Sequence, residues 1–155
     1  MKGNAKVIAW LNKQLTAELS AADQYFVHSR MYEDLGLMKL FERLKHEAEE
    51  ELEHATDLIQ RILFLEGTPD VASRDALSIG KTVPEMLEND LQSEYSVGAM
   101  LKEGIALCEI EKDYESREIL EKLLEDTEVD HTWWLEQQLG LIDKIGLQNY
   151  MQAQM

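Results

Sequence analysis

The chain has 155 residues and a formal net charge of −16. This acidity argues against nucleic-acid binding, which needs a basic face, and against anionic membrane surfaces. A hydrophobic content of 45% with only two prolines and eight glycines predicts one helix-rich globular domain. The single cysteine, Cys108, cannot form an intrachain disulfide. Because no signal peptide or membrane-length apolar run is found, we expect a cytoplasmic protein without membrane partners.

Helical periodicity dominates the chain. Asn4 and Thr82 are suitable N-cap residues, and Gly36 and Gly67 interrupt the pattern. Both prolines lie in or beside the non-periodic stretch 67–82, which is long enough to cross the length of a bundle. The sequence therefore predicts a single all-α domain over residues 1–155, a ferritin-like four-helix bundle with a long crossover between its second and third helices. The predicted helices span about residues 4–34, 37–66, 82–112 and 114–140, the last of them ending at 140 or slightly beyond, and a short C-terminal fifth helix follows residue 146.

Each long helix carries an acidic residue near the middle of its apolar stripe, and two helices carry Glu-x-x-His there. A spacing of three residues places both side chains of such a pair on one helical face. Four carboxylates and two imidazoles form the ligand set of a dinuclear metal centre in a bundle core, and these donors suit iron or manganese. Either pair alone would be a common solvated surface pair, but the combination favours metal. The six predicted ligands are Glu18, Glu51, His54, Glu94, Glu128 and His131.

Three further residues are candidates for supporting roles. Tyr25 lies two turns beyond Glu18 on the same stripe, where it could hydrogen-bond to a ligating carboxylate, donate an electron, or simply fill the core. His46 and Glu50 lie one turn apart, off the central stripe. They are either a second, looser iron site or a solvated pair.

Four stretches, MKGNAKVIAWLNKQLTAEL, DQYFVHSRMYED, RILFLEG and LIDKIGLQNYMQAQM, resemble the bacterioferritin family, and the resemblance covers essentially the whole chain. It implies a homo-oligomer of 24 subunits, a hollow shell in which a ferroxidase oxidises Fe(II) with oxygen or hydrogen peroxide and stores a ferric mineral. It places the family's di-iron ligands on the same six residues and the family's nearby tyrosine on Tyr25. It matches His46 and Glu50 to the inner-surface iron site, and the fifth helix to the four-fold channels.

One position departs from the family pattern. Bacterioferritins bind haem b through a methionine that follows the first Glu of the second-helix motif, and here that residue is Leu52. Leucine has no lone pair to offer iron, so we expect no haem b in the homo-oligomer. Co-assembly with a haem-binding bacterioferritin subunit stays open. Thr68 replaces an apolar residue at the docking surface of the bacterioferritin-associated ferredoxin, which leaves that partner open as well.

The predicted mechanism assigns a role to each ligand. Glu51 and Glu128 bridge two Fe(II) ions, Glu18 and His54 complete one coordination sphere, and Glu94 and His131 complete the other. Three alternatives stay open: a structural subunit that only builds shells, a di-metal enzyme that protects against hydrogen peroxide, and a di-manganese protein.

Overall fold

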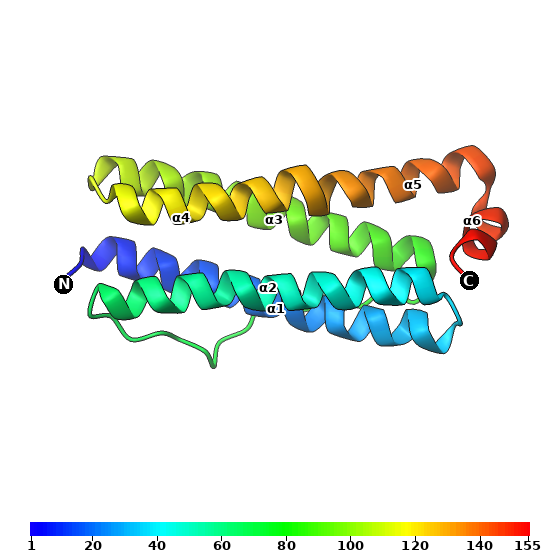
Figure 1. Ribbon diagram of the computed structural model, residues 1–155, viewed down its shortest axis with the longest axis horizontal. Helices are drawn as coiled ribbons and strands as arrows, with labels where there is room; N and C mark the ends of the chain where they lie inside the picture. Colours follow the sequence, from blue (N-terminus) through cyan, green and yellow to red (C-terminus); the bar gives the residue numbers. More distant parts are fainter.

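Four long helical stretches lie side by side as two antiparallel pairs in the computed structural model, which describes residues 1–155 (Figure 1). One pair is α1 with α2, and the other is α3 with the stretch formed by α4, a π-helical segment and α5. No strand is present, so the predicted all-α class is confirmed. The elements are α1 (Ala5–Asp34), α2 (Met38–Phe64), α3 (Val83–Ile110), α4 (Tyr114–Glu125), the π-helical segment η1 (Asp126–Thr132), α5 (Trp133–Ile145) and α6 (Leu147–Ala153).

The ends of the helices follow from local chemistry. The side chain of Asn4 accepts the N–H of Lys6 at 2.8 Å and thereby caps α1. Thr82 and Glu85 form a capping box at the start of α3. Gly36 adopts a φ of +75° in the short turn between α1 and α2, a conformation that suits glycine. Both N-caps predicted from the sequence are confirmed.

The connection between α2 and α3 runs along the bundle and brings the chain to the opposite end, where α3 begins (Figure 1). It is held to α1 by side chains that accept its backbone N–H groups. Ser20 Oγ accepts from Asp75 at 2.8 Å, and Gln24 Oε1 accepts from Ser78 at 3.0 Å. This connection is the predicted crossover. None of the helices combines the length and apolarity needed to span a membrane.

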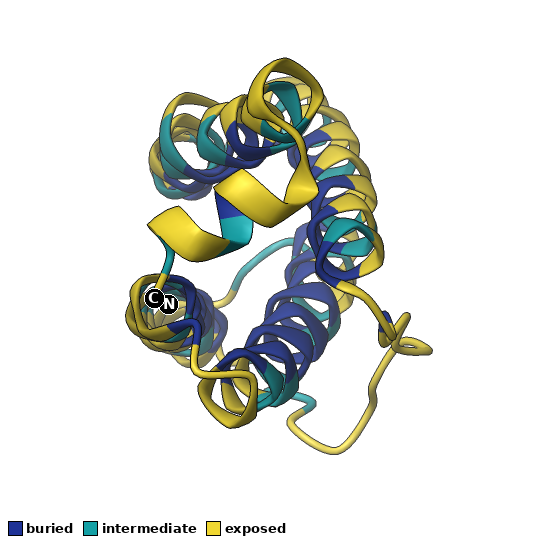
Figure 2. Cartoon of the chain, turned by 90° about the vertical axis from the view of Figure 1, so that its right-hand side faces the viewer, coloured by how far each residue is buried: buried dark blue, intermediate teal, exposed yellow.

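The predicted short fifth helix, α6, lies across one end of the bundle (Figure 2). Its Tyr150 is fully buried and donates a hydrogen bond to Gln138 Oε1 at 2.8 Å. Because this side chain belongs to the apolar core, α6 closes that end of the bundle.

The core consists of two apolar clusters separated by a polar layer. The first cluster includes Leu11, Leu58 and Leu101, and the second includes Leu40 and Leu87. Along their helices the buried residues Glu51, His54, Glu94 and His131 fall between members of the first cluster and members of the second, and the buried Glu18 lies at the inner end of the first cluster. The bundle therefore encloses a polar layer near its middle, and this layer is the candidate site.

Candidate metal centre

Five of the six predicted ligands meet in the polar layer, and each is between 0% and 4% exposed. They form two groups of three whose donor atoms lie within 4.8 Å of one another, and Glu51 belongs to both groups. The first group adds one carboxylate and one imidazole from α1 and α2, and the second adds one of each from α3 and η1. The groups are Glu18, Glu51 and His54, and Glu51, Glu94 and His131.

Glu51 presents one oxygen to each imidazole. Its Oε2 lies 3.3 Å from His54 Nδ1, and its Oε1 lies 3.1 Å from His131 Nδ1. The two rings are stacked, with centroids 6.0 Å apart and planes at 23°. A carboxylate placed between two imidazoles in this way is suited to bridge two metal ions, each bound by one ring.

The two outer carboxylates complete the groups. Glu18 Oε1 accepts a hydrogen bond from Gln14 Nε2 at 2.7 Å, and its Oε2 faces His54 Nδ1 at 3.8 Å. Glu94 Oε1 lies 3.2 Å from His131 Nδ1 and accepts a hydrogen bond from the hydroxyl of the buried Tyr25. Burial and the negative charge of Glu94 raise the pKa of Tyr25 well above its usual value, so Tyr25 stays a hydrogen-bond donor.

Protons provide the positive charge of the metal-free layer. Burial, followed by repulsion from Glu18, raises the pKa of Glu51 to about 8. Burial acts to lower the pKa of His54, but the carboxylates of Glu18 and Glu51 outweigh it and raise the pKa to about 11. The pKa of His131 is raised in the same sense by the carboxylates around it. Because a metal needs deprotonated ligands, its binding must release these protons.

The chemistry of the layer fits divalent cations. Several buried oxygen and nitrogen atoms that could bind a metal have no hydrogen-bond partner. They are Glu18 Oε2, Glu51 Oε2, Glu94 Oε2 and His54 Nδ1. A buried polar atom without a partner costs about 1–3 kcal/mol. These atoms belong to the two three-residue groups, so a cation in each group would satisfy them. Oxygen and imidazole nitrogen donors suit iron or manganese.

The structure does not bring Glu128 into the layer. Its carboxylate points outward, is 46% exposed and lies 2.6 Å from Lys102 Nζ. The reason is the π-helical segment, because the rule that residues three apart share a face holds for an α-helix. Thr127, four residues before His131, is buried instead, and its hydroxyl has no partner. Asp126, five residues before His131, approaches His54.

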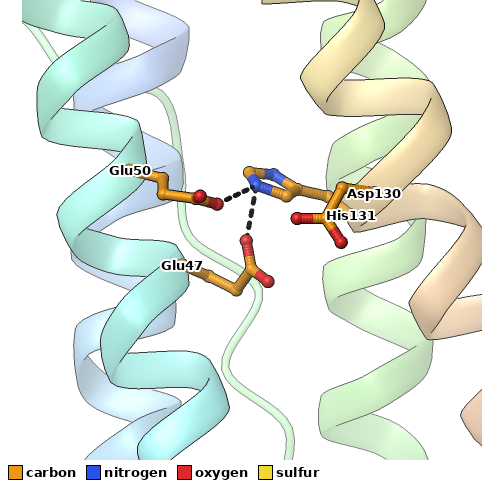
Figure 3. A group of neighbouring side chains, drawn as sticks. All are labelled: Glu47, Glu50, Asp130 and His131. Carbon is orange, nitrogen blue, oxygen red and sulfur yellow. Dashed lines mark hydrogen bonds and ion pairs between the residues drawn. The ribbon is translucent and has the colours of Figure 1, made fainter.

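A second group of acids surrounds the outer nitrogen of His131 (Figure 3). Glu47 and Glu50 reach from α2 towards this ring and lie 2.5 and 2.8 Å from Nε2. Asp130 lies beside them and pairs with Arg43, whose guanidinium also contacts Glu47. One signal for this group is present in the sequence, because Glu47 lies on the apolar stripe one turn before Glu51.

The two remaining candidate positions lie outside the layer. The side chain of His46 is 58% exposed, and its Nε2 pairs with Glu50 at 3.1 Å at the edge of the second acidic group. Leu52 is 52% exposed on the surface of α2.

A helical bundle with carboxylates and imidazoles converging at its centre has the arrangement from which helical-bundle proteins build metal sites. The family described as "Ferritin-like domain" matches residues 8–145. The chain is 61% identical to "Bacterial ferritin" of Synechocystis sp. over 155 residues, covering 100% of this chain and 99% of that protein. It is 60% identical to "Bacterial ferritin" of Pseudomonas aeruginosa, covering 99% of both, and 41% identical to "Bacterioferritin" of Mycobacterium leprae, covering 97% and 94%. The chain therefore belongs to the ferritin-like family and to its bacterioferritin group.

Proposed function

We propose that this protein stores and detoxifies iron as a ferroxidase, oxidising Fe(II) to Fe(III) at an intrasubunit di-iron centre. The observation that carries the proposal is the pair of three-residue groups that share Glu51. The membership of the ferritin family and the names of the relatives support iron as the metal and storage as the purpose.

In the proposed centre Glu51 bridges two Fe(II) ions. Glu18 and His54 hold one ion, and Glu94 and His131 hold the other. The bound iron supplies the electrons that reduce oxygen or hydrogen peroxide. Around it, Tyr25 fixes the orientation of Glu94 by its hydrogen bond, and the two apolar clusters above and below the layer keep water out. Glu128 is left out of this ligand set because its carboxylate pairs with Lys102.

We place the second, looser iron site on the acidic group of Figure 3. Of the two interpretations left open for Glu50, we take the iron site. Its hydrogen bond with His131 outweighs burial and lowers the pKa of Glu50 to about 2, so this carboxylate is charged at neutral pH. Glu47 and Asp130 join it, whereas His46 contributes only through its pair with Glu50. This group touches the outer nitrogen of His131 and could therefore take iron that leaves the di-iron centre.

We propose that the chain works in the cytoplasm as a hollow shell of 24 subunits. Several large apolar side chains are more than 40% exposed in the single chain, which supports burial against other copies. Among them are Phe26, Leu35, Met38 and Leu52. Because Leu52 offers no lone pair, the homo-oligomer binds no haem b, and a haem-binding partner subunit would have to supply it.

An anaerobic Fe(II) titration of the metal-free protein, followed by oxygen, tests the proposal. We expect saturation at two iron ions per chain and rapid growth of ferric absorbance. A shell that assembles without this fast phase would favour the structural-subunit alternative. Faster oxidation with hydrogen peroxide than with oxygen would favour the protective enzyme, and manganese retained after expression without added iron would favour a di-manganese protein.

A further inference from the structure

We propose that Asp126 is a positioning residue that orients the imidazole of His54. Glu47 orients the imidazole of His131 in the same way. Each carboxylate accepts the Nε2–H of its ring and leaves Nδ1 free to face a metal ion. This inference rests on the proposed di-metal function and adds residues outside the ligand set.

Both rings have the same orientation relative to the centre. Nδ1 of His54 and Nδ1 of His131 face Glu51, at 3.3 and 3.1 Å. On the opposite side, His54 Nε2 lies 3.0 Å from Asp126 Oδ2, and His131 Nε2 lies 2.5 Å from Glu47 Oε2. A carboxylate that binds one imidazole nitrogen fixes the proton there, which makes the other nitrogen the metal ligand and holds the plane of the ring.

The π-helical segment explains why Asp126 reaches this position. Asp126 and His131 are five residues apart, which corresponds to one π-type turn, so they share a face of η1. In an α-helix, residues five apart point in different directions. One π-helical turn therefore supplies His131 to one three-residue group and, through Asp126, supports His54 of α2 in the other group. This accounts for the presence of a rare helix type at the site.

The two supports differ in strength. The side chain of Asp126 is 48% exposed and is the sole carboxylate on His54 Nε2. Glu47 is 3% exposed, and Glu50 adds a second contact to His131 Nε2. Removal of Asp126 should therefore loosen one ring only, and the two metal ions of a chain should become unequal in affinity.

Cobalt(II) titration of the metal-free, full-length protein tests this assignment, with binding followed by visible absorption and by calorimetry. We expect two Co(II) ions per wild-type chain. In Asp126→Ala one ion should bind on the order of 10–100-fold more weakly, while the other keeps its affinity and its spectrum. Asp126→Asn should restore part of the loss, because its amide oxygen can still accept the Nε2–H without carrying charge. Glu125→Gln is the matched control, since the carboxylate before Asp126 makes none of these contacts, and it should bind both ions as the wild type does.

The outcomes separate the two levels of the proposal. Wild-type affinity for both ions in Asp126→Ala would overturn the positioning role while leaving the di-metal function intact. An equal loss of both ions, together with a lower unfolding temperature of the metal-free variant, would overturn it too, because Asp126 would then act only on the fold. A wild-type chain that binds no Co(II) in the layer would overturn the proposed function itself.

Discussion

Replacing Glu94 or Glu128 with glutamine tests which of these two carboxylates reaches the proposed metal centre. Glu94 lies on α3 and faces the centre in either case, whereas Glu128 would face it only if the fourth helical stretch were an uninterrupted α-helix. The π-helical segment turns Glu128 outward. Glu94 is 1% exposed and contacts His131 and Tyr25. Loss of one partner from a buried charged pair costs about 3–5 kcal/mol. At one factor of ten for every 1.4 kcal/mol, Glu94→Gln should weaken binding of one iron ion by about 10²- to 10⁴-fold.

Glu128→Gln should behave differently. The pair between Glu128 and Lys102 is about half exposed, and such pairs contribute about 0.2–1 kcal/mol to stability. This variant should therefore oxidise two Fe(II) ions per chain in the fast phase, as the wild type does. Stopped-flow absorbance after mixing with oxygen measures this number directly. If Glu128→Gln loses the fast phase as Glu94→Gln does, then the claim that the π-helical segment turns Glu128 away from the centre is wrong.

Three further predictions follow from the same geometry. Glu51→Ala should lose both metal ions, whereas Glu18→Ala should lose one, as counted by equilibrium dialysis with Co(II), because Glu51 alone belongs to both groups. The metal-free protein should lose stability as the pH rises from 6.5 to 8, measured by urea unfolding. The pKa of Glu51 is raised to about 8 and that of His54 to about 11, so both residues hold protons in the folded state that the unfolded chain has released. A free energy of unfolding that does not change with pH over this range would contradict this. The homo-oligomer reconstituted with haem b should give no spectrum of an iron held by two methionines, because Leu52 has no lone pair, and such a spectrum would refute this reading.

The fold could be predicted because its signals are local. Helical periodicity, the caps at Asn4 and Thr82 and the breaks at Gly36 and Gly67 each depend on neighbouring residues only. The predicted fourth helix, over residues 114–140, is the exception. It is divided by η1, because no simple spacing rule marks a π-helical turn in a sequence rich in good helix formers.

The site could be predicted where the helices are regular. Glu18, Glu51, His54 and Glu94 lie on α-helical stripes, so their common direction follows from spacing. The role of Glu128 stays a prediction, because the rule for residues three apart does not hold across a π-helical turn and the structure turns this carboxylate towards Lys102.

The support from Asp126 could not be anticipated. It joins a residue of η1 to His54 in α2, 72 positions away in the chain. A contact of this kind depends on how helices pack, and a single sequence contains no direct signal for it. The same holds for the second acidic group, in which Asp130 of η1 meets Glu47 and Glu50 of α2.

The most direct test of the central claim is a crystal structure of the Co(II)-loaded protein with anomalous diffraction recorded at the cobalt edge. The account predicts two cobalt peaks per chain on either side of Glu51, one bound by His54 Nδ1 and the other by His131 Nδ1, with Glu128 remote from both. A single peak, or two peaks that do not share Glu51, would contradict the claim that this bundle holds a carboxylate-bridged pair of metal ions.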